Sequence, residues 1–240
     1  MIVQGDMTWR VAAIIVAGGI GRRMGGDVPK QYLAVGGIPI LARTIAAFQR
    51  EEVVDEIVLV APQQDLYMVA EDIVDAHRLE KVRRVVAGGA TRQDSTAAGL
   101  AAVEGDHTVV LVHDGVRPFI RGEIIRRAAT VACDQGAALV AVPVVDTIKR
   151  ANAATEAVET IPRETLWAAQ TPQAFRIGLL RRAIDRARAD GVQATDEAML
   201  VERLGIPVPI VSGDAENIKI TVPEDLIRAE EIARRWEAPC

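Results

Sequence analysis

The stretch Val11-Ala-Ala-Ile-Ile-Val16 runs directly into Ala17-Gly18-Gly19-Ile20-Gly21-Arg22-Arg23-Met24, and Pro29-Lys30 closes it. The apolar run predicts a buried strand, and the glycines after it predict a tight turn. Glycines let backbone N–H groups approach a polyphosphate, and the end of a strand holds such a turn rigid. Arg22, Arg23 and Lys30 add positive charge that glycine amides lack. The stretch therefore favours a loop for a nucleoside triphosphate.

Two better-known phosphate loops do not fit this stretch. A Walker A loop needs a lysine followed by Ser or Thr after its glycines, and none follows here. A dinucleotide-binding loop needs a third glycine where this chain has Met24. What remains, G-x-G-x-R-M followed by P-K, resembles the signature of sugar-nucleotide pyrophosphorylases and related nucleotidylyltransferases. An ordinary strand-to-helix turn stays open as the alternative, because such turns often carry glycine.

The composition places the chain among globular proteins of the reducing cytosol. Its 240 residues suffice for one large domain, and 50% of them are hydrophobic while only 3% are aromatic, which suits buried parallel strands under Ala-rich helices. A net charge of −5 gives no overall attraction to nucleic acid or anionic lipid. Cys133 and Cys240 form no close pair and have no metal-ligand spacing. We find no signal-peptide pattern and no apolar run of membrane length, so we expect a cytoplasmic protein.

Apolar runs alternate with helical patterns along almost the whole chain. We expect strands at residues 12–16, 56–61, 83–87, 108–113, 139–142 and 208–212. We expect helices at residues 40–49, 66–76, 91–104, 122–134, 177–189, 196–204 and 224–236. This alternation predicts an α/β fold with a doubly wound, mostly parallel sheet over a single domain of residues 1–240. Ligands of such sheets bind beyond the carboxyl ends of the strands.

Residues 146–164 interrupt the alternation. Thr147-Ile-Lys-Arg150 and Ala157-Val-Glu-Thr-Ile161 have the period of strands and flank a short polar connection. We interpret them as a two-stranded hairpin arm inserted in the domain. Because an isolated hairpin is marginal in water, it should pack against a partner, either as a dimerisation arm or as a lid over the active site.

His113-Asp114-Gly115-Val116-Arg117-Pro118 follows another apolar run. At the end of a strand, Asp114 is placed to hold Mg²⁺ against phosphate oxygens or to accept from a substrate hydroxyl. A plain Asp-Gly turn with a local ion pair to Arg117 is the competing interpretation. His113 precedes the strand end, so we expect it to point into the protein and not to act as an acid or base.

Three further segments carry polar residues where packing alone does not require them. Gly88-Gly89-Ala90-Thr91-Arg92-Gln93-Asp94-Ser95 reads as a strand-to-helix junction, with Thr91 as the helix cap and Ser95 near a nucleobase. Thr195-Asp196-Glu197 reads as a helix start with a threonine cap. Thr221 and Glu224 predict a capping box just after Lys219, whose ordinary role would be that of a surface lysine.

Taken together, these segments resemble the 2-C-methyl-D-erythritol 4-phosphate cytidylyltransferase family of the non-mevalonate isoprenoid pathway. The matching motifs, in chain order, are A-G-G-I-G-R-R-M, P-K-Q-Y-L, R-Q-D-S, H-D-G-V-R-P, D-T-I-K-R, R-x-x-L-W-x-x-Q-T-P-Q-x-F, T-D-E and N-I-K-I-T-x-P-E-D. The block that begins at Arg163 is the most specific of them. The resemblance implies a Rossmann-like nucleotidyltransferase that transfers CMP from CTP to methylerythritol 4-phosphate with Mg²⁺, in the bacterial cytoplasm or the plastid stroma.

The resemblance also implies roles for individual residues. Arg23, Lys30, Arg163 and Lys219 would be catalytic. Residues around CTP would be Ala17, Gly18, Gly19, Gly21, Arg23, Lys30, Gly89, Ser95 and Asp114. Residues around the acceptor would be Asp114, Arg117, Thr147, Arg163, Thr171, Thr195 and Lys219. Asp114 would bind the metal, and Asn217 is a weaker metal-side candidate. Thr147 and Arg163 would reach the neighbouring subunit of a homodimer through the arm.

Two alternatives share most of these motifs. A ribitol 5-phosphate cytidylyltransferase would differ chiefly in its acceptor pocket. A catalytically inactive nucleotide-binding module would lack Arg23, Lys30 or Lys219, and all three are present. Gly115 and Val116 stand where the family often has two alanines, and Val116 is therefore expected to narrow the substrate pocket.

Overall fold

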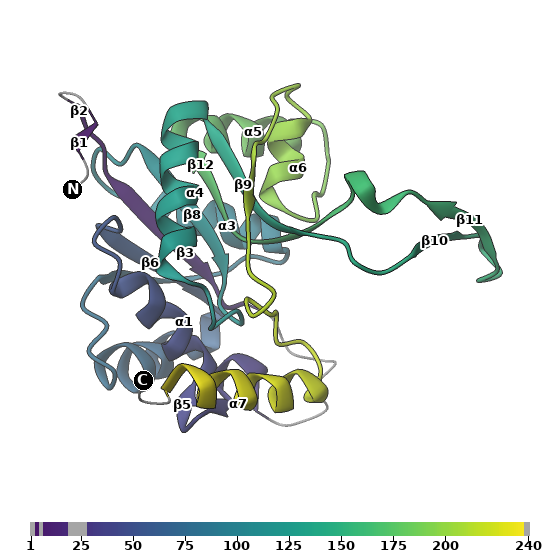
Figure 1. Cartoon of the computed structure of the whole chain (residues 1–240). Helices are drawn as coiled ribbons and strands as arrows, with labels where there is room; N and C mark the ends of the chain where they lie inside the picture. Colours follow the sequence, from purple (N-terminus) through teal and green to yellow (C-terminus); the bar gives the residue numbers. More distant parts are fainter. Residues whose placement is uncertain (1–2, 5–6, 19–27, 238–240) are drawn as a thin grey trace.

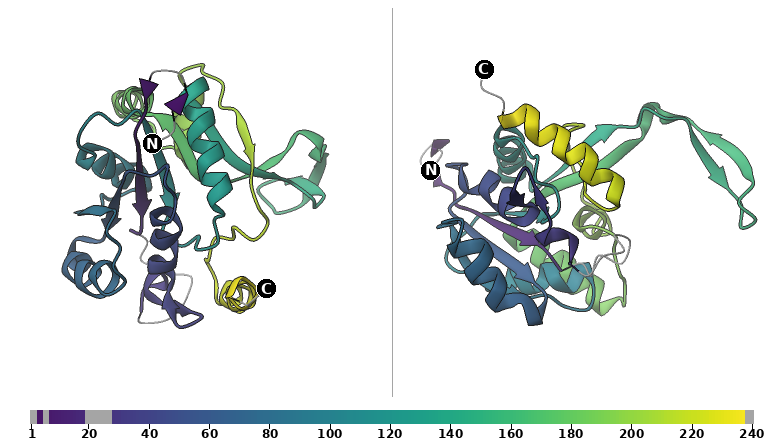
Figure 2. Two further views of the ribbon diagram at one scale, coloured as in Figure 1. Left: turned by 60° about the vertical axis from the view of Figure 1, so that its left-hand side comes forward. Right: turned by 90° about the horizontal axis from the view of Figure 1, so that it is seen from below.

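The computed structural model describes residues 3–4, 7–18 and 28–237 of the chain. A seven-stranded sheet forms its centre, with helices on both faces (Figures 1 and 2). The strands are β3 Val11–Val16, β6 Glu56–Ala61, β7 Val82–Ala87, β8 Val109–Asp114, β9 Ala137–Pro143, β12 Trp167–Arg176 and β13 Ile210–Ser212, in the order β13-β9-β12-β8-β3-β6-β7. All neighbouring pairs are parallel except those of β12. The predicted doubly wound, mostly parallel α/β fold is confirmed.

The longer helices begin and end within two residues of the predicted bounds. They are α1 Ile40–Gln49, α3 Arg92–Ala102, α4 Gly122–Gln135, α5 Ile177–Ala189, α6 Glu197–Glu202 and α7 Pro223–Glu237. One predicted helix has a different type of helical structure. Residues 66–76 do not form a regular α-helix but a 3₁₀ turn η2 Gln63–Asp65, a single turn α2 Leu66–Met68 and a π-helical segment η3 Val69–Asp75. The described short elements before α1 are β1 Val3–Gln4, β2 Met7–Thr8, η1 Lys30–Tyr32, β4 Ala34–Val35 and β5 Ile38–Pro39.

The sheet separates two apolar cores. Alternate residues of β3 supply both of them, since Ala13 and Ile15 join one core while Ala12 and Ile14 join the other. The first core lies under α1, α4 and η3, and the second lies under α3, α5 and α6. Strands buried on both faces need continuous apolar runs, which is why β3 carries no polar residue.

A third, smaller core holds α7 at one end of the sheet. Ile220 and Ile232 pack with Val116 and Phe119 there. The backbone N–H of Ile220 also donates to the carbonyl of Val116 over 3.0 Å. This packing brings the segment that precedes α7 alongside the residues that follow β8.

The long strand β12 was not predicted from the sequence. It lies antiparallel between β8 and β9, and its register shifts between Ala169 and Gln173. Its buried half carries Gln170, Thr171 and Gln173, so polar side chains occupy the centre of the sheet. A Gln-Thr-Pro-Gln sequence has neither the alternation nor the apolar run that marks a strand, and tertiary contacts decide its conformation.

The predicted hairpin arm is present and projects from the body of the molecule (Figures 1 and 2). Strands β10 Ile148–Ala151 and β11 Ala157–Ile161 pair with each other in a separate two-stranded sheet. A 3₁₀ turn, η4 Arg163–Thr165, leads back into β12. Val158 on the arm is 60% exposed. In the part of the chain that the structure describes, no helix combines the length and the apolar character that crossing a membrane requires.

Candidate active site

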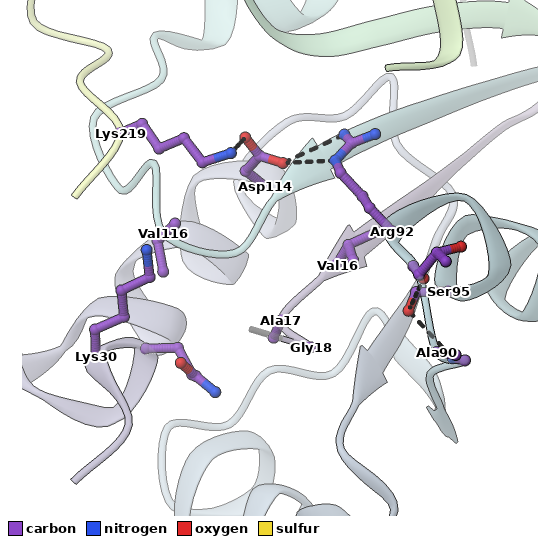
Figure 3. A pocket seen from close by; sticks show the side chains of 13 residues that line it. Val16, Ala17, Gly18, Lys30, Ala90, Arg92, Ser95, Asp114, Val116 and Lys219 are labelled. Carbon is purple, nitrogen blue, oxygen red and sulfur yellow. Dashed lines mark hydrogen bonds and ion pairs between the residues drawn. The ribbon is translucent and has the colours of Figure 1, made fainter. Parts of the chain in front are cut away.

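A cavity of about 280 Å³ opens at the carboxyl edge of the sheet, where β3, β7 and β8 end. It is lined by Val16, Ala17, Gly18, Lys30, Gln31, Gly89, Ala90, Thr91, Arg92, Ser95, Asp114, Val116 and Lys219. In Figure 3, Lys30 and Lys219 extend from one side of this cavity, while Arg92 and Ser95 lie on the other. Of the residues predicted around CTP, the structure brings together Ala17, Gly18, Lys30, Gly89, Ser95 and Asp114. Gly19, Gly21 and Arg23 lie outside the described residues.

A second cavity of about 180 Å³ adjoins the first. Both are lined by Arg92, Asp114 and Lys219. The remaining lining residues of the second cavity are Arg117, Ala169, Gln170, Thr171, Gln173, Thr195 and Asp196. The predicted acceptor residues Arg117, Thr171 and Thr195 therefore lie together in the lining of the second cavity. Val116, expected in the substrate pocket, instead lines the first cavity.

Asp114 is the electrostatic centre of the two cavities. Its Oδ1 lies 3.3 Å from Nε and from Nη2 of Arg92, and its Oδ2 lies 2.9 Å from Nζ of Lys219. Nε of Arg117 lies 3.4 Å from the same Oδ2. Burial would raise the pKa of the Asp114 carboxyl, but Arg92, Lys219 and Arg117 together hold it well below its ordinary value. Asp114 is therefore ionised at neutral pH and shared among three cations.

His113 points into the protein, as predicted. It is 0% exposed and packs against the ring of Phe48. Burial lowers the pKa of His113 to about 4, so its ring is neutral. Nε2 lies 3.1 Å from the carbonyl of Arg117, which can only accept, so Nδ1 accepts from the hydroxyl of Thr171 at 2.9 Å. That hydroxyl also accepts from the Asp114 N–H over 3.1 Å.

The junction between β7 and α3 is built as the sequence suggests. Thr91 and Asp94 form a capping box at the start of α3. Ser95 Oγ accepts from the N–H of Gly89 over 3.2 Å and donates to the carbonyl of Thr91 over 3.0 Å. A Cβ on Gly89 would lie 2.3 Å from the Cβ of Asp94, so only glycine fits at that position. Ser95 thus braces the turn as well as lining the cavity.

Two predicted helix caps were wrong. At α6 the cap is Asp196, whose carboxylate accepts from the N–H of Met199 over 3.0 Å. Thr195 is therefore left exposed beside the second cavity. Before α7, the Asp225 carboxylate accepts from the N–H groups of Thr221 and Val222, over 2.7 and 3.0 Å. Asp225, four residues after Thr221, can cap the helix as well as the predicted Glu224. This is possible because several N–H groups at the start of a helix have no partner within the helix.

Thr147 and Arg163 are not brought to either cavity of their own chain. Both are exposed near the base of the arm, and a guanidinium nitrogen of Arg163 donates to the carbonyl of Val145. Asn217 is fully buried and lines neither cavity. Its amide nitrogen donates to the Thr171 carbonyl over 2.9 Å, which ties the segment before α7 to β12.

Among the site residues that the sequence analysis missed, Arg92 and Glu197 carry charge. Arg92 lines both cavities. The Glu197 carboxylate, which is 1% exposed, accepts a hydrogen bond from the Arg92 guanidinium. Both were assigned to helix starts, where charged residues are common. In the sequence, only their positions within the R-Q-D-S and T-D-E motifs pointed to a role in the site.

The residues present fit Mg²⁺ only in part. No group of three or more His, Cys, Asp or Glu side chains that could hold a metal occurs within residues 3–4, 7–18 and 28–237. Mg²⁺ is commonly bound by one or two carboxylates together with substrate phosphates. Asp114, ionised and on the cavity wall, fits as one such ligand, provided that phosphate oxygens supply most of the others.

Comparison with known proteins gives a consistent result. The family model for 2-C-methyl-D-erythritol 4-phosphate cytidylyltransferase matches residues 11–235. The protein of that name from Geobacter metallireducens is 50% identical over 223 residues, which span 92% of this chain and 96% of that protein. The corresponding protein from Geotalea uraniireducens is 48% identical, spanning 92% of this chain and 95% of that protein.

Solved structures agree with the sequence matches. The 4-diphosphocytidyl-2C-methyl-D-erythritol synthase from Anaerococcus prevotii superposes with a TM-score of 0.83 at 32% identity, covering 95% of this chain and 97% of that chain. The 2-C-methyl-D-erythritol 4-phosphate cytidylyltransferase from Thermus thermophilus superposes with a TM-score of 0.74 at 37% identity, covering 94% and 99%. These matches favour neither the ribitol 5-phosphate enzyme nor the inactive module. Because they extend over nearly all of this chain and of its relatives, the chain belongs to the 2-C-methyl-D-erythritol 4-phosphate cytidylyltransferase family.

Proposed function

We propose that this enzyme transfers CMP from CTP to 2-C-methyl-D-erythritol 4-phosphate, giving 4-diphosphocytidyl-2-C-methyl-D-erythritol and pyrophosphate. The acceptor phosphate attacks the α-phosphorus of CTP in line with the leaving pyrophosphate. The observation that carries the proposal is the family match over residues 11–235, joined to two adjoining cavities at the carboxyl edge of the sheet that share Asp114, Arg92 and Lys219.

The chemistry needs position and charge more than proton transfer. The attacking phosphate is already an anion, so no strong general base is required, and His113 is neutral and buried away from both cavities. The barrier lies in bringing two anions together and in stabilising the pentacoordinate phosphorus. Lys30, only 9% exposed on the wall of the first cavity, is the cation we assign to that charge, together with Arg23 of the glycine-rich loop.

We assign the first cavity to the nucleotide. The backbone at Ala17, Gly18, Gly19 and Gly21 would bind phosphates, because N–H groups of glycine-rich turns are accessible to anions. Gly89 and Ser95 would face the cytosine. A Cβ built on Gly18 would lie 3.6 Å from Ser95 Oγ, so the segments that carry these two residues lie side by side in the wall of the first cavity.

We assign the second cavity to methylerythritol 4-phosphate. Arg117 and Lys219 would attract its phosphate, and Thr171, Thr195 and the ionised Asp114 would hydrogen-bond its hydroxyls. Lys219 contacts Asp114 on the wall common to both cavities, so we also assign it to charge stabilisation during transfer. When bound, Mg²⁺ held partly by Asp114 would neutralise charge on the triphosphate.

We further propose that the enzyme is a homodimer and that Thr147 and Arg163 of each arm complete the acceptor site of the partner subunit. The arm supports this because it leaves the body of its own chain, while both residues remain exposed and away from the cavities of that chain. The bacterial relatives and the composition support action in the cytoplasm, with no nucleic-acid or membrane partner.

The direct test is pyrophosphate release from CTP and Mg²⁺ with methylerythritol 4-phosphate or ribitol 5-phosphate as acceptor. We expect strong preference for the former. Preference for ribitol 5-phosphate would keep the nucleotide chemistry and overturn the acceptor assignment. No release with either acceptor would reject the proposed function.

A further inference from the structure

Arg92 lies between two buried carboxylates in the wall common to both cavities. Its Nη1 donates to Oε1 and Oε2 of Glu197 over 2.5 and 2.7 Å. Its Nε and Nη2 lie at the longer distance of 3.3 Å from Oδ1 of Asp114. Figure 3 shows the guanidinium directed at Asp114 above the cavity. The shorter bonds show that Glu197 fixes this guanidinium more firmly than Asp114 does.

Glu197 is itself held in one place. Its carboxylate is 1% exposed and also accepts from the hydroxyl of Thr96 over 2.7 Å. Thr96 and Arg92 both belong to α3, whereas Glu197 is the first residue of α6. The Arg92–Glu197 pair therefore joins α3 to α6. The helix α3 follows Gly89, which lines the first cavity, and α6 follows Thr195, which lines the second.

The charges explain why such a pair matters to Asp114. Burial alone would lower the pKa of Arg92, but Glu197 and Asp114 raise it above its ordinary value, so the guanidinium remains charged. A buried ion pair is weak evidence for a stabilising role, because desolvation offsets most of the attraction. Without the Glu197 charge, Arg92 would be attracted to the one remaining carboxylate, Asp114, which the acceptor also needs.

We propose that Glu197 is a positioning residue: it holds Arg92 in the partition between the two cavities and so keeps Asp114 available to the acceptor. This inference rests on the proposed transfer to methylerythritol 4-phosphate. Loss of the Glu197 charge lets the guanidinium close onto Asp114, so the acceptor must compete with Arg92 for that carboxylate. The hydrogen bonds that hold the Gly89 turn come from Thr91, Asp94 and Ser95 and do not involve Glu197.

A double-mutant cycle tests the proposal. The proteins are the wild type, Glu197→Gln, Arg92→Met and the double variant, each assayed well below its melting temperature for kcat and for KM of both substrates. Glu202→Gln, an exposed glutamate of the same helix, is the matched control. We expect Glu197→Gln to raise the acceptor KM by roughly tenfold or more with the KM for CTP within about threefold. In the Arg92→Met background the same change should add less than about threefold, because the two residues act as one unit.

Three results would overturn the proposal. They are a normal acceptor KM in folded Glu197→Gln, an equal rise of KM for both substrates, and effects of the two substitutions that simply multiply. If Glu197→Gln does not fold, Glu197→Asp keeps the charge but shortens the side chain, and it should raise the acceptor KM by less than about tenfold while the KM for CTP stays within about threefold of that of the wild type. Calorimetry of methylerythritol 4-phosphate binding to the wild type separates the proposed function from the role of Glu197. Failure of the wild type to bind or to react would remove the proposed function. The role of Glu197 is rejected only by the results for the variants.

Discussion

At the scale of the residue, the site is organised by one carboxylate and the cations around it. Asp114 remains ionised because Arg92, Lys219 and Arg117 outweigh the cost of its burial. Since the folded pKa lies below the unfolded one, the stability that these contacts contribute is present above about pH 4 and is lost at lower pH. Asp114 should therefore stay ionised at physiological pH, and a loss of activity on the acidic side of a pH–activity profile near that pH should not come from its protonation.

Replacing Lys30 tests the charge-stabilising role at this scale. We expect Lys30→Ala to lower kcat by roughly 100- to 1000-fold, about 3 to 4 kcal/mol, by analogy with loss of an oxyanion-hole donor. Lys81→Ala is the control, because the ammonium of Lys81 donates to the carbonyl of Glu51 and lines neither cavity. Steady-state kinetics on both variants, with circular dichroism as a check of folding, decides the point. Near-normal turnover by folded Lys30→Ala would reject the role.

His113 provides a prediction for stability instead of turnover. Its pKa is about 4 in the folded protein, against about 6.5 when unperturbed. Between these values the unfolded chain binds the proton and the folded chain does not, so the stabilisation is complete above about pH 6.5 and declines toward pH 4. From pH 7 to pH 4.5, urea unfolding should show a loss of stability that is about 2 to 3 kcal/mol smaller in His113→Gln than in the wild type. Parallel pH curves for the two proteins would contradict the assignment.

Single residues were predictable where their type and position carried the information. The inward orientation of His113 followed from its place before a strand end. The partnership of Arg92 with Glu197 did not, because it joins residues 105 positions apart in the chain. Such pairing depends on how α3 and α6 pack, and one sequence does not encode that packing as a local pattern.

At the scale of the element, the junction between β7 and α3 forms a tightly packed part of the wall of the first cavity. A Cβ on Gly89 would lie 2.3 Å from Cβ of Asp94 and 3.2 Å from its carbonyl carbon, whereas one on Gly178 would meet nothing within 4 Å. Gly89→Ala must displace the turn, so we expect the KM for CTP to rise by about tenfold, equivalent to ~1.4 kcal/mol.

Gly178→Ala serves as the control for that substitution. It should leave the kinetics unchanged and keep or raise stability by up to about 1 kcal/mol, because alanine is favoured over glycine in a helix. Measurement of initial rates against CTP concentration distinguishes the two variants. A normal KM for CTP in Gly89→Ala would show that the turn does not bind nucleotide.

Elements with a clear apolar period were predicted well, and polar ones were not. β6, α1 and α5 match their predicted bounds, because each carries an uninterrupted apolar run or stripe. β12 was missed because Gln170, Thr171 and Gln173 occupy its buried half. These side chains bond to the segments around Asn217, Asp196 and Asp114, so the polar strand is itself part of the site.

At the scale of the whole molecule, the topology assembles the site from distant segments. The carboxyl ends of β3, β7 and β8 meet at one edge, and the segment before α7 returns to that edge through the hydrogen bond between Ile220 and Val116. The doubly wound sheet was predictable from the alternation of strands and helices. The approach of Lys219 to Asp114 was implied by the family resemblance alone, because no periodic pattern encodes it.

The arm gives a prediction for the proposed homodimer. Lys30→Ala and Arg163→Ala should each be almost inactive alone. After mixing and subunit exchange, a heterodimer with arms acting in trans has one site with both residues intact. Because half of the dimers are mixed, activity should return to about a quarter of the wild-type rate. Absence of any recovery, with exchange verified by mass spectrometry, would mean that Arg163 serves its own subunit or that the arm does not pair subunits.

We propose that CMP passes directly between two ligands held in adjoining cavities, with no covalent intermediate on the enzyme. Exchange of radiolabelled pyrophosphate into CTP, measured with Mg²⁺ and without acceptor, tests it most directly. We expect no exchange until methylerythritol 4-phosphate is added, because the leaving pyrophosphate can be displaced only by the acceptor phosphate. Exchange in the absence of acceptor would reveal a CMP-enzyme intermediate and would exclude direct transfer.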